Sequence, residues 1–535
     1  MANTFKKVLD RLLWAQVAPS PNAHAAAMSM AGDMRNDSSR NPFIYTLHSN
    51  ALLNRFNIVT KAWQVVSTTP LTAGTFGAGS TSAFAPSFGA VGTIAAGATT
   101  TSVTLTTALP TAVGVNMLAN RGGSGELGFK LRIIDTVAGR TEERWIVGNT
   151  AGTTPTITLE TALTFTPATG ARYELLCGRL FMLGAGTTGA GIFRTFEPAS
   201  NTLANRGTTN LPATIGTDSA MLVLDELYVP YNHRPGEGMV KGATSYDTGL
   251  VALLATAAGA SSLTGQATGG DAVIAANEYR NFQIRIVADP TTPASVGQRR
   301  IIASHTAGPS PVYTLGTAWT TQPSASARFV IEQPNLIVLR SSAVTTTYTY
   351  NYTDATVNNG TTSIAADAWS TTYVGAAPAA NAAGCLWAPS FGIQPDPARN
   401  ARHSFNYFWR GGAVTLDLLD IAGGTTGLWT GGITYDGNVN SFGAGTTGCY
   451  SPFGQEGRYT YVNVYTASAV NQIFRFDARN RVFSPYVPTD FIQSGTAAQG
   501  GRMAAYAAID GSDTYDVVLL QSHLATVAQE LIPLV

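Results

Sequence analysis

The amino-acid sequence predicts an all-β protein, and three observations lead to this expectation. The first is a series of short segments in which apolar and polar residues alternate between glycines and prolines, because a period of two is typical of strands that bury one face. The second is an internal duplication of a threonine-rich unit. The third is a recurring hairpin pattern in which a strand, a polar turn and a strand bearing an aromatic residue follow one another.

The duplication relates residues 149–175 to residues 305–331. The two stretches align without a gap, and twelve of the 27 positions are identical. A strand-like segment precedes each copy, at 130–134 and at 283–287. Alternation punctuated by Thr-Ala-Gly turns predicts two small antiparallel β-modules. The predicted module boundaries are 85–178 and 255–334.

The amino-acid composition of the chain indicates which kinds of molecule it is expected to bind. Only 12% of the residues are charged, and 32 basic residues balance 32 acidic ones. A duplex-binding protein would carry a basic patch to neutralise phosphates, and here the arginines are scattered with only five lysines among them. We therefore expect no nucleic-acid specificity. A weakly charged surface instead favours association with other proteins.

The cysteines and the N-terminal residues indicate the cellular compartment in which the protein is made. Cys177, Cys385 and Cys449 are odd in number and far apart, so they predict buried thiols and no disulfide framework. Asp10 and Arg11 interrupt the apolar residues near the start of the chain, which therefore makes no convincing export signal. No stretch approaches the roughly 20 apolar residues of a membrane span. We expect assembly in a cytoplasm.

Residues 1–18 predict a short amphipathic helix within an N-terminal arm. Charged residues occupy the other side of this helix. The apolar face could pack on its own domain or dock on a neighbouring subunit, since termini are ordered only when they are tied down. The candidate assembly contacts on this face are Phe5, Leu9, Leu12 and Leu13.

The hairpin pattern recurs outside the duplicated modules. Its clearest instances begin with an apolar and aromatic strand that ends in Asn, Glu or Asp and turns into a second strand. The candidates are 52–63, 191–203, 416–429, 472–483, 348–354 and 515–520.

This pattern resembles the outer hairpin of a kelch-type β-propeller blade. The double glycine that usually marks a kelch blade is absent before most of these hairpins. The resemblance implies a propeller of about five to seven blades whose faces pack through recurring aromatics. It also implies that the two chain ends complete one blade and that the duplicated modules are insertions in blade loops. The implied domains are an arm at 1–40, a first blade at 41–84, the first module at 85–178, propeller at 179–254, the second module at 255–334 and the remaining blades at 335–535.

Three loops share a Gly-Gly-Thr-Thr-Gly or Gly-Ala-Gly-Thr-Thr-Gly string, at 184–189, 423–427 and 443–448. None carries the Gly-Lys-Ser/Thr of a phosphate-binding loop, so we interpret them as hairpin turns whose glycines permit positive φ. The six histidines show no HExxH motif and no paired ligand spacing. We expect no cofactor and no metal site.

Residues 224–238 are the richest in functional groups. Asp225, Glu226 and His233 invite an acid/base proposal. Adjacent residues on a strand face opposite sides, however, and a Pro/Gly run follows, so an ordered loop is the stronger interpretation. Tyr228 and Tyr231 are instead candidate aromatic anchors for a protein contact.

The weakly charged body, the N-terminal arm and the duplicated modules are together similar to structural proteins of tailed bacteriophages. This resemblance implies a non-enzymatic virion component of the tail or nozzle, the neck or the capsid, which contacts copies of itself and other virion proteins. One alternative is a module that binds a host-surface glycan, with Trp387, Trp409 and Trp429 as stacking platforms, although a blade tryptophan is more often core. A further alternative is an enzyme acting on polysaccharide, which would gather carboxylates in a central channel.

Overall fold

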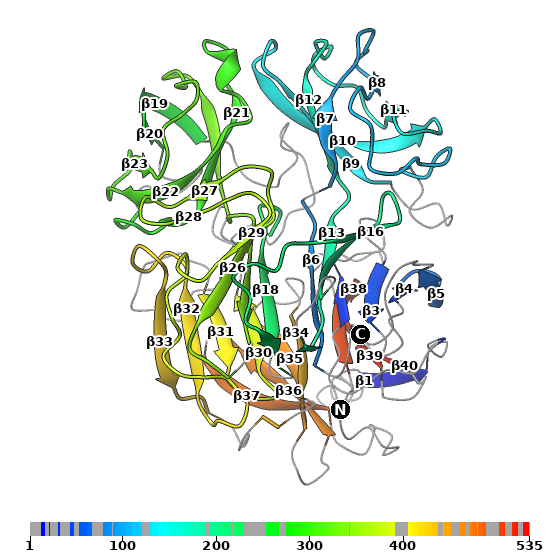
Figure 1. Ribbon diagram of the computed structural model, residues 1–535, viewed down its shortest axis with the longest axis vertical. Coiled ribbons are helices and arrows are strands. Elements are labelled where there is room, and N and C mark those ends of the chain that lie inside the picture. The colour runs from blue at the N-terminus through cyan, green and yellow to red at the C-terminus, as the bar shows by residue number, and fades with distance from the viewer. Residues whose placement is uncertain are drawn as a thin grey trace, which may run out of the picture.

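The computed structural model describes most of the chain and shows an all-β protein (Figure 1). Its described residues are 12–16, 21, 30–32, 43–47, 53–66, 79–87, 89–119, 128–187, 192–216, 219–228, 253–266, 274–341, 343–390, 405–436, 442–443, 446–450, 459–465, 471–478, 480–487, 502–508, 516–522 and 528–533. Within these ranges the helical structure is the single 3₁₀ turn Pro293–Ser295.

Antiparallel sheets of four strands form a propeller-like body in the described part of the chain. Five of these sheets each take their strands in chain order, and a sixth combines the last three strands with the first one. The leading strands of the six sheets contact one another in sequence, and the last contacts the first. These leading strands are β2 (Met30–Gly32), β6 (Thr81–Ala85), β18 (Ala220–Leu224), β30 (Leu386–Ser390), β34 (Thr447–Tyr450) and β38 (Arg502–Ala508).

The other strands follow outward in the same order. The second strands are β3 (Phe43–Leu47), β13 (Arg179–Leu183), β25 (Leu336–Arg340), β31 (Phe405–Trp409), β35 (Tyr459–Tyr465) and β39 (Asp516–Ser522). The third strands are β4 (Leu53–Asn57), β15 (Phe193–Glu197), β26 (Thr347–Asn351), β32 (Leu416–Asp420), β36 (Asn471–Asp477) and β40 (Ala528–Pro533). The fourth strands are β5 (Ala62–Val66), β16 (Thr202–Asn205), β29 (Ala368–Ser370), β33 (Leu428–Ile433), β37 (Val482–Val487) and β1 (Leu12–Gln16).

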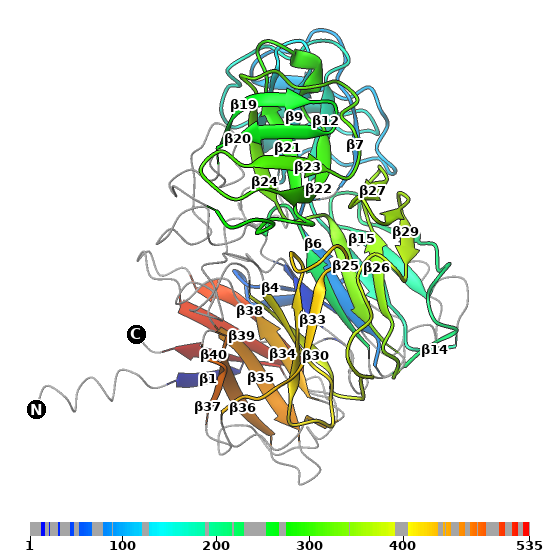
Figure 2. The same ribbon diagram turned by 90° about the vertical axis from the view of Figure 1, so that its left-hand side faces the viewer.

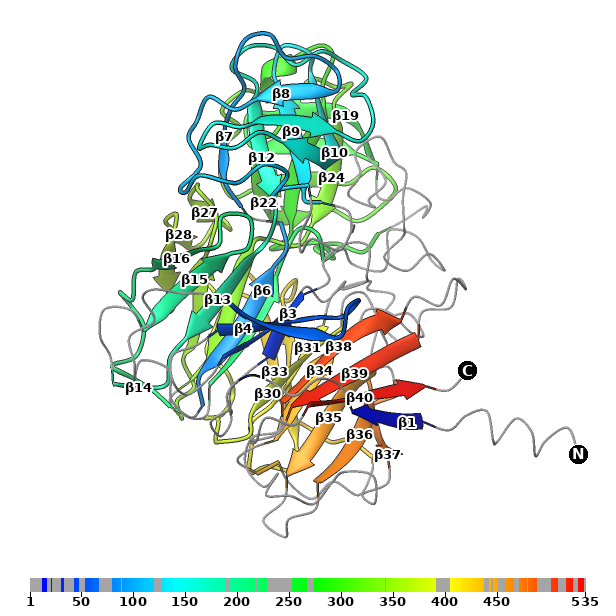
Figure 3. The ribbon, with the colours of Figure 1, turned by 90° about the vertical axis from the view of Figure 1, so that its right-hand side faces the viewer.

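The first strand of the chain closes the propeller. β1 pairs antiparallel with β40, with Leu12 opposite Pro533 and Gln16 opposite Gln529, and Figure 3 shows the two strands side by side. The two chain ends therefore share one sheet, and its N-terminal strand is β1 rather than a strand of the blade expected at 41–84. The prediction of a helix is wrong for Leu12–Gln16, because pairing with an open sheet edge overrides a local helical pattern.

Two boundaries also differ from the expected ones. β2 lies inside the predicted arm, and β6 leads the second sheet although it was expected in the first blade. Both strands are short and small-residue-rich, so they carry little of the alternation that marks a strand in sequence.

Each duplicated module is a small barrel inserted after the leading strand of a blade. The first barrel comprises β7 (Val91–Thr93), β8 (Ser102–Thr104), β9 (Lys130–Asp135), β10 (Arg140–Asn149), β11 (Thr156–Leu159) and β12 (Arg172–Leu176). The second comprises β19 (Leu253–Gly259), β20 (Ser262–Gly265), β21 (Gln283–Ala288), β22 (Arg299–His305), β23 (Val312–Leu315) and β24 (Arg328–Glu332). Corresponding strands pair in the same cyclic order, and the bridge between Ile94 and Leu105 completes the first ring.

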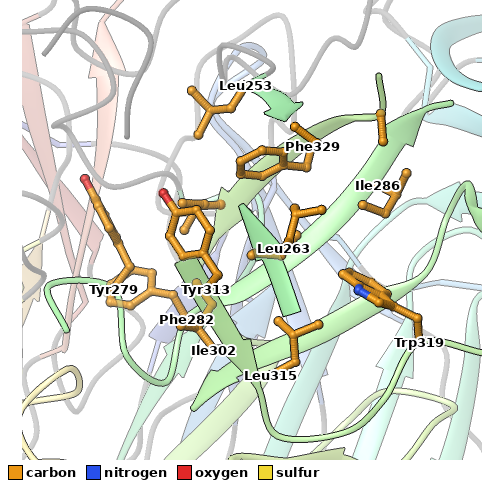
Figure 4. Close-up of a cluster of buried hydrophobic side chains, with 14 of the residues drawn as sticks. Leu253, Leu263, Tyr279, Phe282, Ile286, Ile302, Tyr313, Leu315, Trp319 and Phe329 are labelled. Carbon is orange, nitrogen blue, oxygen red and sulfur yellow. The ribbon is translucent and has the colours of Figure 1, made fainter. Parts of the chain in front are cut away.

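Each barrel has its own core, Ile134 of the first barrel also packs into the core of the second, and the two lie together at one end of the molecule (Figures 1 and 2). Leu263, Tyr313 and Phe329 are among the buried residues of the second core, which Figure 4 shows. A turn of the propeller enters each core, since Ala199 packs into the first barrel and Ala422 into the second. The barrels are thus seated on the propeller by apolar contacts as well as by their connecting chains.

The repeated Thr-Ala motif of the duplication has a structural cause. Arg144 Nε donates to the carbonyl of Ala162 at 3.2 Å, and Arg300 Nε donates to the carbonyl of Ala318 at 2.8 Å. The two contacts are equivalent in the two barrels, and each ties β10 or β22 to the loop that follows β11 or β23. Two short two-stranded ribbons complete the fold: β14 (Gly186–Thr187) with β17 (Thr214–Ile215), and β27 (Val357–Asn358) with β28 (Ser363–Ile364).

Candidate functional site at the junction of the barrels and the propeller

The connections to both barrels converge on one buried region, which we call the junction. The chain enters the first barrel past Ser87 and the second past Asp225–Tyr228, and it leaves the second barrel past Asn335. The barrels also touch directly, because Arg140 of β10 lies opposite Ala288 of β21. The junction is defined by Asp225, Glu226 and Asn335 of these connections and by the barrel residues Arg132, Glu143, Glu174, Gln283, Arg285, Arg299 and Glu332.

Arg132 of β9 is the centre of the charged residues. Its side chain is 0% exposed, and its cross-strand neighbours are Glu143 on β10 and Glu174 on β12. Arg132 Nε donates to Glu143 at 2.7 Å and Nη1 donates to Glu174 at 2.8 Å. Nη1 also donates to Glu226, which belongs to the propeller connection. One guanidinium therefore joins the first barrel to the propeller.

Arg299 of β22 joins all three bodies. It donates from Nη1 and Nη2 to the two carboxylate oxygens of Glu174, at 2.9 and 2.8 Å, a bidentate arrangement. It also donates from Nε and Nη2 to Glu226, at 3.0 and 3.2 Å. Such charge-assisted pairs are stronger and more directional than neutral hydrogen bonds. A single side chain of the second barrel thereby contacts the first barrel and the propeller.

Glu226 is held by donors from every side. Its backbone N–H donates to Asn335 Oδ1 at 2.9 Å, and its carboxylate accepts from Asn335 Nδ2 at 3.1 Å and from Gln283 Nε2 at 3.2 Å. Burial alone would raise the pKa of Glu226, but the charges of Arg132 and Arg299 lower it well below its usual range. The pKa of Glu174 is likewise lowered, against the effect of burial, chiefly by Arg299.

Asp225 points to the opposite side of the chain. Its carboxylate accepts from Ser87 Oγ, Tyr352 Oη and the Leu227 N–H, each at 2.8 Å, and from the Ser87 N–H at 3.2 Å. Burial raises the pKa of Asp225 to about 6, opposed by the hydrogen bond from Leu227. Asp225 thus ties the entry to the first barrel to the third blade.

The remaining arginine of the junction pairs within its own barrel. Arg285 of β21 donates from Nε and Nη2 to the two oxygens of Glu332, at 2.7 and 3.0 Å, and both side chains are 0% exposed. The carboxylates of the junction are therefore already bonded to protein donors, and Glu143, Glu174, Glu226 and Glu332 are all buried. The arrangement connects the two barrels and the propeller through ion pairs.

Two further findings concern chemistry and membranes. Within the described ranges, no group of three or more His, Cys, Asp or Glu side chains is placed to hold a metal ion. In the same part of the chain, no helix has the length and apolarity needed to cross a bilayer.

The structure distributes the predicted site residues unevenly. Tyr228 is 0% exposed and donates its hydroxyl to the carbonyl of Phe84 at 3.0 Å, so the prediction of an exposed anchor there is wrong. Its ring packs next to the junction, in a buried cluster with residues of the second and third blades. Leu12 and Leu13 lie in β1. Phe5, Leu9, Tyr231 and His233 lie outside the described residues.

The tryptophans proposed as glycan platforms lie in the core between blades. Trp409 is 0% and Trp387 is 8% exposed. Trp387 packs against Trp429 with ring centroids 5.7 Å apart, and Trp429 Nε1 donates to the carbonyl of Gly375 at 3.0 Å. The interpretation of these residues as blade core is therefore the one the packing supports.

Most of the junction residues were not predicted from the sequence. Asp225 and Glu226 were singled out, and they lie in the turn that follows β18, so strand alternation does not set their orientations. Arg132, Glu174 and Arg299 were not, because their partners come from strands and connections far away in the sequence. One signal was present in the sequence. Arg132 and Arg285 occupy the same position in two apolar strands of the duplication, and a buried charge in such a strand requires a partner.

Comparison with known proteins adds little. No protein-family model matches the chain, and no curated protein sequence matches it. Among solved structures, the chain is similar to the computationally designed Ika8 protein, with 8% identity and a TM-score of 0.27 over 97% of this chain and 100% of that one. It is also similar to the NanB sialidase from Streptococcus pneumoniae, with 7% identity and a TM-score of 0.23 over 98% of this chain and 96% of that one. Neither similarity is strong enough to support an argument.

Proposed function

We propose that this protein is a non-enzymatic structural component of a bacteriophage virion, in the tail or nozzle, the neck or the capsid, which assembles through contacts between subunits. The observation that carries the proposal is the junction. A network of buried ion pairs holds two duplicated barrels on a propeller, and a part that keeps three bodies in one geometry suits a structural role.

Closure of the propeller supports the same function. The outermost strand of the last sheet comes from the start of the chain, so unravelling from either end must break the β1–β40 pairing. Radial closure also leaves only short edges exposed. A rigid virion component needs this resistance to local opening.

The surface chemistry supports assembly with other proteins. The chain is electrically balanced, with 32 basic and 32 acidic residues, so little charge repulsion opposes the packing of copies against one another. An obligate contact between subunits typically buries more than about 2,000 Å². Head-to-tail contacts of that size close into rings or extend into filaments.

The test is to follow the protein in purified particles of the phage that encodes it. Quantitative mass spectrometry of the particles is expected to find the chain in a fixed copy number, and light scattering of the isolated protein is expected to find a closed oligomer. Imaging of tagged particles would then place it in the tail, the neck or the capsid. A protein absent from particles and monomeric in solution would contradict the proposal.

A further inference from the structure

The duplication allows the same position to be compared in the two barrels. In the first barrel, β9 and β10 place Arg132 directly opposite Glu143. In the second, the equivalent strands β21 and β22 place Arg285 directly opposite Arg299. The equivalent position is thus acidic in one barrel and basic in the other. Opposite charges across a strand pair are stabilising, and like charges are destabilising.

The third strand of each ladder extends the contrast. Glu174 of β12 is the other cross-strand neighbour of Arg132, whereas Val330 of β24 is the neighbour of Arg285. The first barrel therefore presents an acid, a base and an acid across three strands, and the second presents two bases and an apolar residue. The first ladder has an excess of negative charge and the second an excess of positive charge.

The two arginines of the second barrel are neutralised differently. Arg285 uses Glu332 of its own barrel. Within the described residues, the ion pairs of Arg299 are made with Glu174 of the first barrel and with Glu226 of the propeller connection. The side chain of Arg299 is 18% exposed, so water replaces these partners only in part. An arginine left in a largely buried site without a carboxylate is strongly destabilising.

We infer that the barrel pair is a directional interface in which the second barrel depends on the first. The acidic pair of Glu174 and Glu226 forms the surface of this interface that recognises the second barrel. The residue of the second barrel that it recognises, in the same chain, is Arg299. The first barrel has no such dependence, since Arg132 keeps Glu143 of its own barrel even when Glu174 and Glu226 are neutralised. This inference does not rest on the proposed virion function.

The test uses the full-length chain and hydrogen exchange resolved by peptide. In the variant Glu174→Gln with Glu226→Gln, the amides of β22 and β23 are expected to lose protection by more than about tenfold relative to those of β9 and β11. Glu160→Gln, an exposed acid of the first barrel, is the matched control and is expected to change neither barrel.

A second background separates the inference from a general loss of structure. Arg299→Met removes the charge that needs partners, while Glu174 and Glu226 keep Arg132 as theirs. Adding Glu174→Gln to Arg299→Met is then expected to leave the protection of β22 and β23 within about twofold, whereas Glu174→Gln alone lowers it by more than about tenfold. Equal losses in both backgrounds, or a larger loss in the first barrel than in the second, would overturn the inference.

Discussion

Asp225 and Glu226 are neighbours in the chain but have different electrostatic surroundings. Glu226 lies among arginines, which keep it ionised, whereas the hydrogen bonds that Asp225 accepts from the described residues come from hydroxyl and amide donors. Burial therefore raises the pKa of Asp225 to about 6, while the arginines lower that of Glu226. The two carboxylates should consequently change the stability of the fold with pH in opposite senses.

The Asp225 contribution is testable by itself. A raised pKa in the folded state means that its stabilisation is complete below the unfolded value and is lost as pH rises through about 6. The change from 3.8 to about 6 corresponds to about 3 kcal/mol. We expect the free energy of unfolding, measured by denaturant at several pH values between 4 and 7, to fall less steeply with pH in Asp225→Asn than in the natural chain. Parallel slopes would show that Asp225 does not titrate there.

The acidic side of the pH profile belongs to Glu174 and Glu226. Their pKa values are lowered in the folded protein, so their stabilisation is present above about pH 4.3 and is lost as pH falls below it. We expect the amides of the second barrel to lose protection from hydrogen exchange below about pH 4 before those of the blades do. Simultaneous loss in barrels and blades would argue against a junction-specific effect.

Removing one charge of the junction should cost much more than removing a surface charge. Glu226→Gln leaves Arg132 and Arg299 with fewer carboxylates, and breaking a buried ion pair typically costs about 3–5 kcal/mol. Asp354→Asn is the matched control, because Asp354 pairs with Arg172 at a site where both side chains are about 40% exposed; we expect it to cost under about 1 kcal/mol. Denaturant unfolding of both variants measures the difference, and similar losses would contradict a buried role for Glu226.

At the scale of elements, the recurring hairpin signature is explained by its turn. The polar residue that ends the third strand accepts a hydrogen bond from the backbone of the turn: Asn57 from Val59, Asp420 from Ala422 and Asp477 from Asn480. Four residues beyond this acceptor, the backbone adopts positive φ at Lys61, Asn201, Gly424 and Arg481. The sequence pattern therefore encodes one turn geometry, repeated in several blades.

Gly424 tests that geometry. Its φ is +67°, and an added Cβ would meet no atom closer than 3.6 Å, so Gly424→Ala should be unfavourable only through the backbone. We expect a loss of about 1 kcal/mol in the free energy of unfolding. Gly114 also has open space, without a positive φ, and Gly114→Ala should be neutral or slightly stabilising. A neutral Gly424→Ala would show that the turn relaxes to another conformation.

At the scale of the molecule, one continuous chain forms a propeller and two barrels and then connects them through the junction. The insertions leave from the leading strands of adjacent blades, so the barrels emerge side by side. The alanines at positions 199 and 422 seat them, and the junction sets their orientation. The ends of the chain meet in the last sheet, which closes the propeller.

Deletion of residues 1–16 tests this closure. Removing β1 leaves β40 as an open edge, and an exposed strand edge is a template for pairing with another chain. We expect a lower thermal midpoint and concentration-dependent association by light scattering. Deletion of residues 1–9 keeps β1 and is the control. Equal behaviour of the two deletions would mean that β1 contributes nothing to closure.

The sequence by itself determined the elements whose chemistry is local. Alternation, glycine and the strand-ending polar residues specify hairpins through turn geometry, which involves only neighbouring residues, and the duplication announces two copies of one barrel. Leu12–Gln16 shows the limit, because its local pattern favours a helix while a strand edge more than 500 residues away makes it a strand.

Only the tertiary structure decided where the charges meet. Arg132, Glu174, Glu226 and Arg299 are separated by up to 125 residues between hydrogen-bonded partners, and no local rule pairs them. The free-energy cost of burying a charge depends on every neighbour that the fold brings to it. An arginine in an apolar strand therefore indicates that a partner is required, but not which residue it is. The folded arrangement supplies that partner, and it converts two similar barrels into a pair with distinct roles.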